Sequence, residues 1–270
     1  PPIPRDKKWV IIVSTSFGCP VKCLMCDASI IYKGNLKTQE MIEQIDYLVT
    51  KYFPDRKVPI PKFKIQFARM GEPAFNNNVL EVLGSLPELY KAPGLMPAIS
   101  TLAPKGRDKF FNELIKIKDR YYSNGRFQLQ FSIHTTNTDS RDRLMPVKKW
   151  NFKDIADYGE KFFNSNDRKI TLNFACTQDY EVEPEVIREY FNPEFFTIKL
   201  TPLNPTVKAY ENKLVSFINP YQPESASQLI NEFKAQGFEV VLSIGEVEEN
   251  KIGSNCGLYL NFNRKNSSAC

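Results

Sequence analysis

The stretch Trp9-Val-Ile-Ile-Val13, followed shortly by Cys19-Pro-Val-Lys-Cys23-Leu-Met-Cys26, decides how the rest of the chain is interpreted. The first part is a short apolar run rich in β-branched residues, which is typical of a buried strand. Similar runs recur at Phe63–Phe67, Ala98–Leu102, Phe127–Ile133, Ile170–Cys176, Phe196–Leu200 and Phe238–Ile244. Helical periodicity marks the segments between them: Thr38–Tyr52, Val79–Leu89, Arg107–Tyr121, Phe152–Phe163, Pro184–Tyr190 and Glu224–Gln236. Strand–helix alternation repeated six times predicts a parallel sheet with helices outside, as an α/β partial (β/α)6 TIM-type barrel.

Composition sets the broad class of the chain. With 270 residues, of which 42% are hydrophobic, the chain has enough apolar side chains for a sizeable core, so we expect one domain over 1–270. No apolar run is long enough for a membrane span, and the polar, proline-rich start lacks the features of a signal peptide. We therefore expect a cytoplasmic protein with no membrane contact. The net charge of +5 permits phosphate or nucleic-acid binding without requiring it.

The cysteine triplet indicates a metal site in a reducing compartment rather than a disulfide framework. Cys19, Cys23 and Cys26 have a CxxxCxxC spacing, which holds three irons of a [4Fe–4S] cluster and leaves the fourth iron for another ligand, whereas protein cysteines normally occupy all four. The alternative is zinc, which needs a fourth Cys or His nearby. The single histidine of the chain, His134, is distant in sequence, so we favour iron–sulfur chemistry.

Polar residues follow the predicted strands at the ends where partial barrels carry their chemistry. Gly71-Glu72-Pro73 follows the second strand, His134 ends the fourth, and Asn204 follows the sixth between two prolines. Each has a simpler explanation: a Gly-Pro turn, a hydrogen-bonded structural histidine, and a turn asparagine. Their shared position at one edge favours a common site.

The other cysteines differ from one another in context. Cys176 ends an apolar strand, where free cysteine is usually core material, and Cys270 lies in the tail. Cys256 lies in Gly253-Ser-Asn-Cys-Gly257, a loop after the last strand, where a thiolate can act as a nucleophile. Basic residues near these loops either line a phosphate-bearing substrate or form solvated surface: Lys105, Arg107, Arg141, Arg143, Lys148 and Lys149.

These segments together resemble the radical S-adenosylmethionine (SAM) family of ribosomal RNA adenine methyltransferases, RlmN and Cfr. The resemblance runs from about Val10 to Leu258, with the motifs in family order. The similar segments are Val13-Ser-Thr-Ser-Phe-Gly-Cys-Pro-Val-Lys-Cys-Leu-Met-Cys26, Met70-Gly-Glu-Pro-Ala-Phe-Asn76, Ile99-Ser-Thr101, Ser132-Ile-His-Thr135 with Arg143-Leu-Met-Pro146, Leu203-Asn204 and Asn255-Cys-Gly-Leu258.

The resemblance implies a radical SAM enzyme that uses a [4Fe–4S] cluster and SAM. The implied cluster ligands are Cys19, Cys23 and Cys26, and the implied SAM contacts are Gly71, Glu72, Ser100, Ser132, His134 and Asn204. Cys256 is implied to accept a methyl group and pass it to an sp² carbon. The implied partners are a flavodoxin- or ferredoxin-type electron donor and a substrate that is RNA or a small molecule.

Four departures from the family pattern concern substrate handling and turnover. Ile12 stands where the family has the cysteine that resolves the covalent adduct, Met25 replaces an aromatic residue, and Asn173 replaces a glutamate. The family's N-terminal RNA-contacting domain has no counterpart in this sequence. Two enzymatic alternatives therefore stay open: methyl transfer through Cys256 with another resolving thiol, such as Cys176, or a non-methylating radical reaction on a small metabolite or peptide. A non-catalytic iron–sulfur protein is a third alternative.

Overall fold

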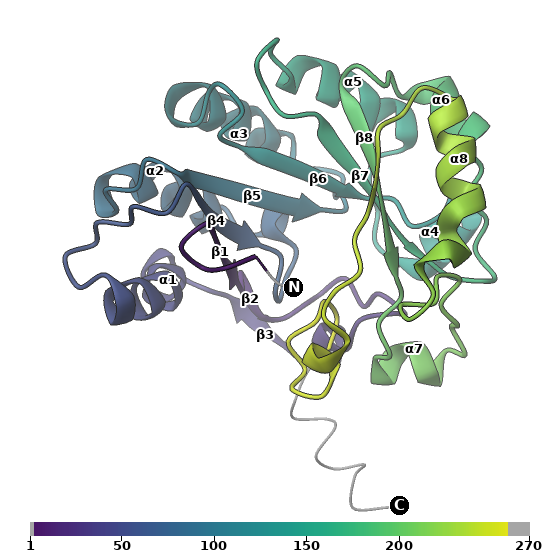
Figure 1. Ribbon diagram of the computed structural model, residues 1–270, viewed down its shortest axis with the longest axis horizontal. Coiled ribbons are helices and arrows are strands. Elements are labelled where there is room, and N and C mark those ends of the chain that lie inside the picture. Colours follow the sequence, from purple (N-terminus) through teal and green to yellow (C-terminus); the bar gives the residue numbers. More distant parts are fainter. Residues whose placement is uncertain (1–2, 259–270) are drawn as a thin grey trace, which may run out of the picture.

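The computed structural model describes residues 3–258, and its main feature is a curved sheet of seven parallel strands (Figure 1). The strands follow one another across the sheet in the order β1-β4-β5-β6-β7-β8-β9. Their bounds are β1 Lys8–Val13, β4 Lys62–Phe67, β5 Leu95–Thr101, β6 Gln128–Ser132, β7 Ile170–Cys176, β8 Phe196–Pro202 and β9 Val240–Leu242. Because the order is sequential and every pairing is parallel, all carboxyl ends meet at one edge.

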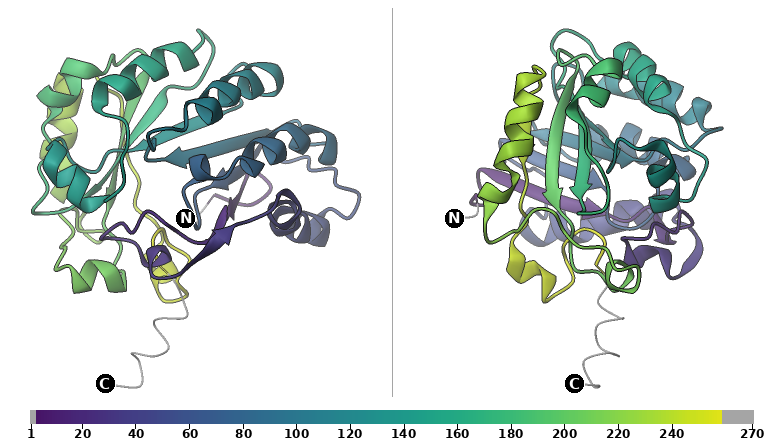
Figure 2. Two further views of the ribbon diagram at one scale, coloured as in Figure 1. Left: turned by 180° about the vertical axis from the view of Figure 1, so that it is seen from behind. Right: turned by 90° about the vertical axis from the view of Figure 1, so that its right-hand side faces the viewer.

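Helices cover the outer, convex face of this sheet and leave its inner face open to the barrel interior (Figure 2). Their bounds are α1 Thr38–Tyr52, α2 Asn78–Leu89, α3 Asp108–Tyr121, α4 Thr138–Leu144, α5 Phe152–Phe162, α6 Pro184–Tyr190, α7 Val207–Glu211 and α8 Ser227–Ala235. The fold class predicted from strand–helix alternation, an α/β partial barrel, is confirmed.

The strands show why two layers form. In β4 the residues Phe63, Ile65 and Phe67 are fully buried, and the intervening Lys64 and Gln66 are only partly buried. Since successive strand residues point to opposite faces, the aromatic and aliphatic side chains pack under the helices while the polar ones face the interior. β8 repeats the alternation. The barrel interior is therefore unusually polar.

The predicted strands and main helices are present, with ends that differ by a few residues. Among the elements that were not predicted are α4, α7, and the two strands of an antiparallel hairpin, β2 Ser16–Gly18 and β3 Tyr32–Asn35. The hairpin brackets the cysteine loop. Gly18 at its base has φ +79°, and a Cβ there would overlap the carbonyl of Ile31, so only glycine fits where the strand enters the loop.

Two further points concern the extent of the chain. Among residues 3–258, no helix is long and apolar enough to cross a membrane. Cys270, expected to be inert, lies outside the described residues.

Candidate active site

A cavity of about 420 Å³ opens at the carboxyl ends of the strands. Every site residue proposed from the sequence lines it: Cys19, Cys23, Cys26, Gly71, Glu72, Ser100, Ser132, His134, Asn204 and Cys256. These residues come from the cysteine loop, four strand ends and the last described loop. The fold thus brings together side chains that are as far apart in the sequence as Cys19 and Cys256.

The cysteine loop is anchored to the far side of the barrel by backbone groups. Asp27, directly after the triplet, accepts hydrogen bonds from the backbone N–H of Val207 (3.2 Å) and Lys208 (2.9 Å) at the start of α7. Its own N–H donates to the carbonyl of Gly257 at 2.9 Å. Thr206 donates its hydroxyl to the carbonyl of Met25 at 3.0 Å. The first and last loops of the barrel are therefore joined beside the thiols.

The three thiols form a donor set suited to a cationic cluster. Burial raises the pKa of Cys19 to about 11 and that of Cys26 to about 12, and raises the pKa of Cys23 well above its ordinary value. Each thiol also feels the charge of its neighbours, so three buried thiolates need a nearby cation to form.

The number of thiols bears on the kind of metal site. Cys19, Cys23 and Cys26 line the same cavity. Three cysteines can hold three irons of a cluster, whereas a structural zinc site needs a fourth protein ligand.

The Gly71–Glu72 turn forms one wall of the cavity. Gly71 has φ +98°, and a Cβ there would collide with the hydroxyls of Thr15 and Ser16. The Glu72 carboxyl accepts hydrogen bonds from the Thr101 hydroxyl, the Leu102 N–H (2.9 Å) and the Ala74 N–H (3.0 Å). Burial raises the pKa of Glu72 to about 7. A carboxyl fixed in this way can accept an ammonium group from a ligand, which would favour its ionised form.

His134 is oriented by the neighbouring strand. Its Nδ1 accepts a hydrogen bond from the Ala175 N–H at 2.9 Å, and its backbone has φ +67°. Burial lowers the pKa of His134 to about 3. The ring is therefore neutral with its proton on Nε2, so it can donate one hydrogen bond into the cavity but is unsuited to act as a base.

The loop that carries Cys256 is held by its backbone. Arg69, just after β4, donates its guanidinium to the carbonyls of Gly253, Ser254 (2.9 Å) and Asn255 (3.0 Å). The Asn204 side chain donates to the carbonyl of Cys256 at 2.9 Å. The Cys256 side chain itself is exposed at the cavity. Sequence reasoning missed Arg69, although its place one residue before Met70-Gly71 at a strand end was a usable signal.

Two expectations change in the structure. Cys176 is 1% exposed within the main core and does not line the cavity, so it is core material and unsuited to resolve an adduct on Cys256. Of the basic residues near the loops, Arg141 is buried and donates to the Trp150 carbonyl, and Arg107 donates to the Ala74 carbonyl. The basic residues that line the cavity are others, Arg69 and Lys199.

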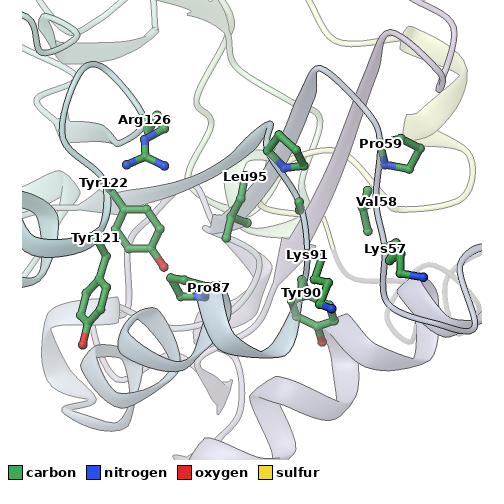
Figure 3. Close-up of a pocket in the computed structure, with 12 residues that line it drawn as sticks. Lys57, Val58, Pro59, Pro87, Tyr90, Lys91, Leu95, Tyr121, Tyr122 and Arg126 are labelled. Atoms are coloured by element: carbon green, nitrogen blue, oxygen red, sulfur yellow. The ribbon is translucent and has the colours of Figure 1, made fainter.

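A second cavity, of about 470 Å³, lies at the opposite, amino ends of β4, β5 and β6 (Figure 3). Tyr90, Tyr122 and Arg126 are among its lining residues. The Tyr122 hydroxyl donates to the Leu83 carbonyl and the Tyr90 hydroxyl donates to Asp46. Because none of the thiols lines this cavity and the hydroxyls of Tyr90 and Tyr122 are already bonded, we do not assign the chemistry to it.

In fold, the chain is similar to solved structures of radical SAM enzymes. The radical SAM methyltransferase from Sphaerobacter thermophilus superposes with a TM-score of 0.70 at 18% identity, covering 93% of this chain and 70% of that one. Streptococcus suis SuiB bound to S-adenosylmethionine superposes with a TM-score of 0.60 at 13% identity, covering 89% of this chain and 51% of that one.

In sequence, the chain is similar to the dual-specificity RNA methyltransferase RlmN of Buchnera aphidicola subsp. Schizaphis graminum. The two are 31% identical over 179 residues, which is 64% of this chain and 47% of that protein. The chain spans about half the length of the curated relatives it matches. No protein-family model matches it.

Proposed function

We propose that the chain is a radical SAM enzyme that transfers a methyl group through Cys256. The observation that carries the proposal is a single cavity lined by three thiols on one loop, a buried carboxyl, a neutral histidine and a fourth, exposed thiol. Within it, Cys19, Cys23 and Cys26 would hold a [4Fe–4S] cluster, which when reduced supplies the electron that cleaves SAM to methionine and a 5′-deoxyadenosyl radical.

The chain's own residues would bind and orient SAM. Glu72 offers a carboxylate for the ammonium group of SAM, at the turn that Gly71 makes possible. His134 offers its Nε2–H as a donor, and Ser100 and Ser132 line the same wall. The barrel around them would exclude water from a reactive radical.

Methyl transfer would begin at Cys256. Its thiolate would attack the methyl carbon of one SAM, forming S-methylcysteine and releasing S-adenosylhomocysteine. The radical from a second SAM would remove a hydrogen atom from that methyl group, giving 5′-deoxyadenosine and a carbon radical that adds to an sp² carbon of the substrate. The exposed position of Cys256 at the cavity supports this role.

Release of the product would need a one-electron acceptor for the adduct radical and a resolving thiol from elsewhere, which would form a disulfide with the Cys256 sulfur as the bond between that sulfur and the transferred carbon breaks. Ile12 lines the cavity where the resembling family carries that cysteine. Apart from Cys256 and the three proposed cluster ligands, residues 3–258 supply no thiol to the cavity. We therefore propose an external thiol, and an electron donor of the flavodoxin or ferredoxin type for reduction of the cluster.

Two experiments test the proposal. Anaerobically reconstituted protein given dithionite and SAM should form 5′-deoxyadenosine, whereas a Cys23→Ala variant should form none; equal amounts would contradict the radical SAM assignment. With methyl-deuterated SAM, mass spectrometry should find a deuterated methyl increment on the Cys256 peptide but not on that of a Cys256→Ala variant. An unmodified Cys256 peptide after turnover would leave the radical chemistry standing and remove the methyl-transfer step.

The second candidate function is a non-methylating radical reaction on a small metabolite or peptide. The polar lining of the barrel interior favours it, because Gln66, Gln130 and Lys199 face the cavity where a substrate would lie. In that case Cys256 would serve as a hydrogen-atom donor or a contact beside the cluster.

A further inference from the structure

Beside the residues assigned to SAM, the cavity is lined by a second polar group, which we call the polar floor. Its members come from four strands and are Gln66 on β4, Gln130 on β6, Asn173 on β7 and Lys199 on β8. Asn173 and Lys199 are register partners on adjacent strands, so their side chains leave the sheet side by side on the same face. TIM-type barrels usually fill this region with branched apolar residues. A polar floor in their place indicates that something polar is bound there.

Lys199 brings an uncompensated positive charge to this floor. No carboxylate among residues 3–258 forms an ion pair with it, and no hydrogen bond from its ammonium group is found there. One layer deeper, Lys64 donates to the Gln128 side chain at 2.8 Å, and burial together with the charge of Lys199 lowers the pKa of Lys64 to about 7. A buried ammonium group without an anion is costly, and a bound anion would relieve that cost.

Asn173 supplies an independent indication of a ligand. The residue is 8% exposed and lines the cavity, while its Oδ1 is buried in the wall without a hydrogen-bond partner among the described residues. Buried polar atoms are nearly always paired in folded proteins, and a rotation of this side chain toward the cavity would pair the acceptor with a donor from a ligand. Since the carbonyl of Asn173 already accepts from the N–H of Ile133 and His134, the residue is fixed in place.

We propose that the substrate is a small molecule whose acidic group, a carboxylate or a phosphate, binds Lys199 and whose N–H or O–H donates to Asn173. This inference rests on the proposed function, because it identifies the class of substrate that the radical would meet. A nucleobase inserted from RNA would fit the floor poorly: its edge is neutral, and its phosphates stay on the backbone outside the barrel.

The cavity volume agrees with a small substrate. At about 420 Å³, the cavity is within the range that holds one ligand of drug size, and SAM would take most of it, which leaves room only for a small substrate. The acid on Lys199 would fix one end of the substrate, while its other end would point toward the residues at the mouth, including Cys256. Such a two-point attachment orients a substrate for reaction at one carbon.

The test is anion binding to the cluster-reconstituted protein with SAM present, measured by calorimetry. Inorganic phosphate and malonate are the two probes, and the one that binds more tightly distinguishes a phosphate from a carboxylate substrate. We expect saturable binding that Lys199→Gln weakens by about ten- to a hundred-fold, the range for a hydrogen bond to a charged group. Lys109→Gln, on the exposed face of α3, removes the same charge from the outer surface and should leave binding unchanged.

A second variant keeps the test decisive if Lys199→Gln folds poorly. Asn173→Asp preserves side-chain volume and places a carboxylate beside Lys199, so it should also weaken phosphate and malonate binding. Absence of saturable binding in the wild type, or equal weakening in Lys199→Gln and Lys109→Gln, would overturn the inference. The inference would also be overturned by an adenine-containing RNA oligonucleotide that inhibits SAM-dependent formation of 5′-deoxyadenosine equally in the wild type and in Lys199→Gln.

These outcomes are separable from those of the proposed function. Formation of 5′-deoxyadenosine without anion binding would remove only the acidic substrate. Anion binding without 5′-deoxyadenosine would remove the radical chemistry and leave an anion site in a barrel of the same fold.

Discussion

The Asn204 side chain donates its Nδ2–H to the backbone carbonyl of Cys256 at 2.9 Å. The contact joins the loop after β8 to the last described loop across the mouth of the barrel. It holds the backbone of Cys256 while its thiol stays exposed. Together with the contacts of Arg69, it fixes the backbone of Cys256 relative to the barrel.

The Arg69 guanidinium is the main anchor of this loop, since it binds three consecutive carbonyls. Arg69→Met should remove all of these charge-assisted hydrogen bonds and loosen residues 251–258. Hydrogen exchange measured by mass spectrometry should then show faster exchange in that segment. Arg188→Met, on the exposed surface of α6, is the matched control, and identical exchange in the two variants would argue against Arg69 as an anchor.

Gly71 should be intolerant of any side chain. Gly71→Ala adds strain at φ +98° and a collision with the hydroxyls of Thr15 and Ser16, so we expect a loss of more than about 3 kcal/mol in the free energy of unfolding. Gly106→Ala is the control, because φ there is +77° but a Cβ would meet open space. It should cost about 1 kcal/mol. Comparable losses in urea titrations of the two variants would show that the close approach at Gly71 is unimportant.

His134 should make stability fall in mild acid. Burial lowers its pKa to about 3 from an ordinary value of 6.5. Between pH 3 and pH 6.5, His134 therefore binds a proton in the unfolded chain but not in the folded chain. Stability from this group is complete above pH 6.5 and is lost as the pH falls below it, at up to about 1.4 kcal/mol per pH unit.

A variant isolates this effect, because His134 is the single histidine of the chain. His134→Asn suits the backbone at φ +67° and does not titrate. Between pH 6.5 and 4.5 the wild type should lose about 2 kcal/mol more than the variant, as measured by denaturant unfolding. Parallel pH profiles would contradict a buried neutral histidine.

The two non-cluster cysteines of the described chain should differ sharply in reactivity. Cys256 is exposed, whereas Cys176 is 1% exposed in the core. Iodoacetamide applied to native, cluster-loaded protein should therefore alkylate the Cys256 peptide and leave the Cys176 peptide unmodified until denaturant is added. An unmodified Cys256 peptide under native conditions would contradict its exposure, and alkylation of Cys176 to the same extent as Cys256 would contradict the burial of Cys176.

Sequence periodicity predicted the barrel because its elements bury one face each. Thr38–Tyr52 and Ile170–Cys176 match α1 and β7 at both ends, since helical and strand patterns there are long and uninterrupted. Elements without such a pattern were missed. The five residues of α7 are too few to show a period, and the start of that helix depends on Asp27, which lies far away in sequence.

The residues of the candidate site were likewise predicted only in part. Motif spacing, strand ends and, for Ser100 and Ser132, the family resemblance nominated the ten residues that line one cavity. Arg69, Lys199 and the unpaired Oδ1 of Asn173 escaped notice, because their meaning lies in partners on other strands or in the lack of one. In the sequence, Lys199 is one of the alternating polar residues of a strand, and only the folded barrel shows that it lines the cavity.

The central claim is that three thiolates hold a cluster whose remaining iron is open to SAM. Electron paramagnetic resonance of the reduced, anaerobically reconstituted protein tests it most directly, with and without SAM. The account predicts an iron–sulfur signal that changes when SAM is added and is lost in Cys23→Ala. A signal indifferent to SAM, or purified protein that holds one zinc ion in place of iron, would contradict it.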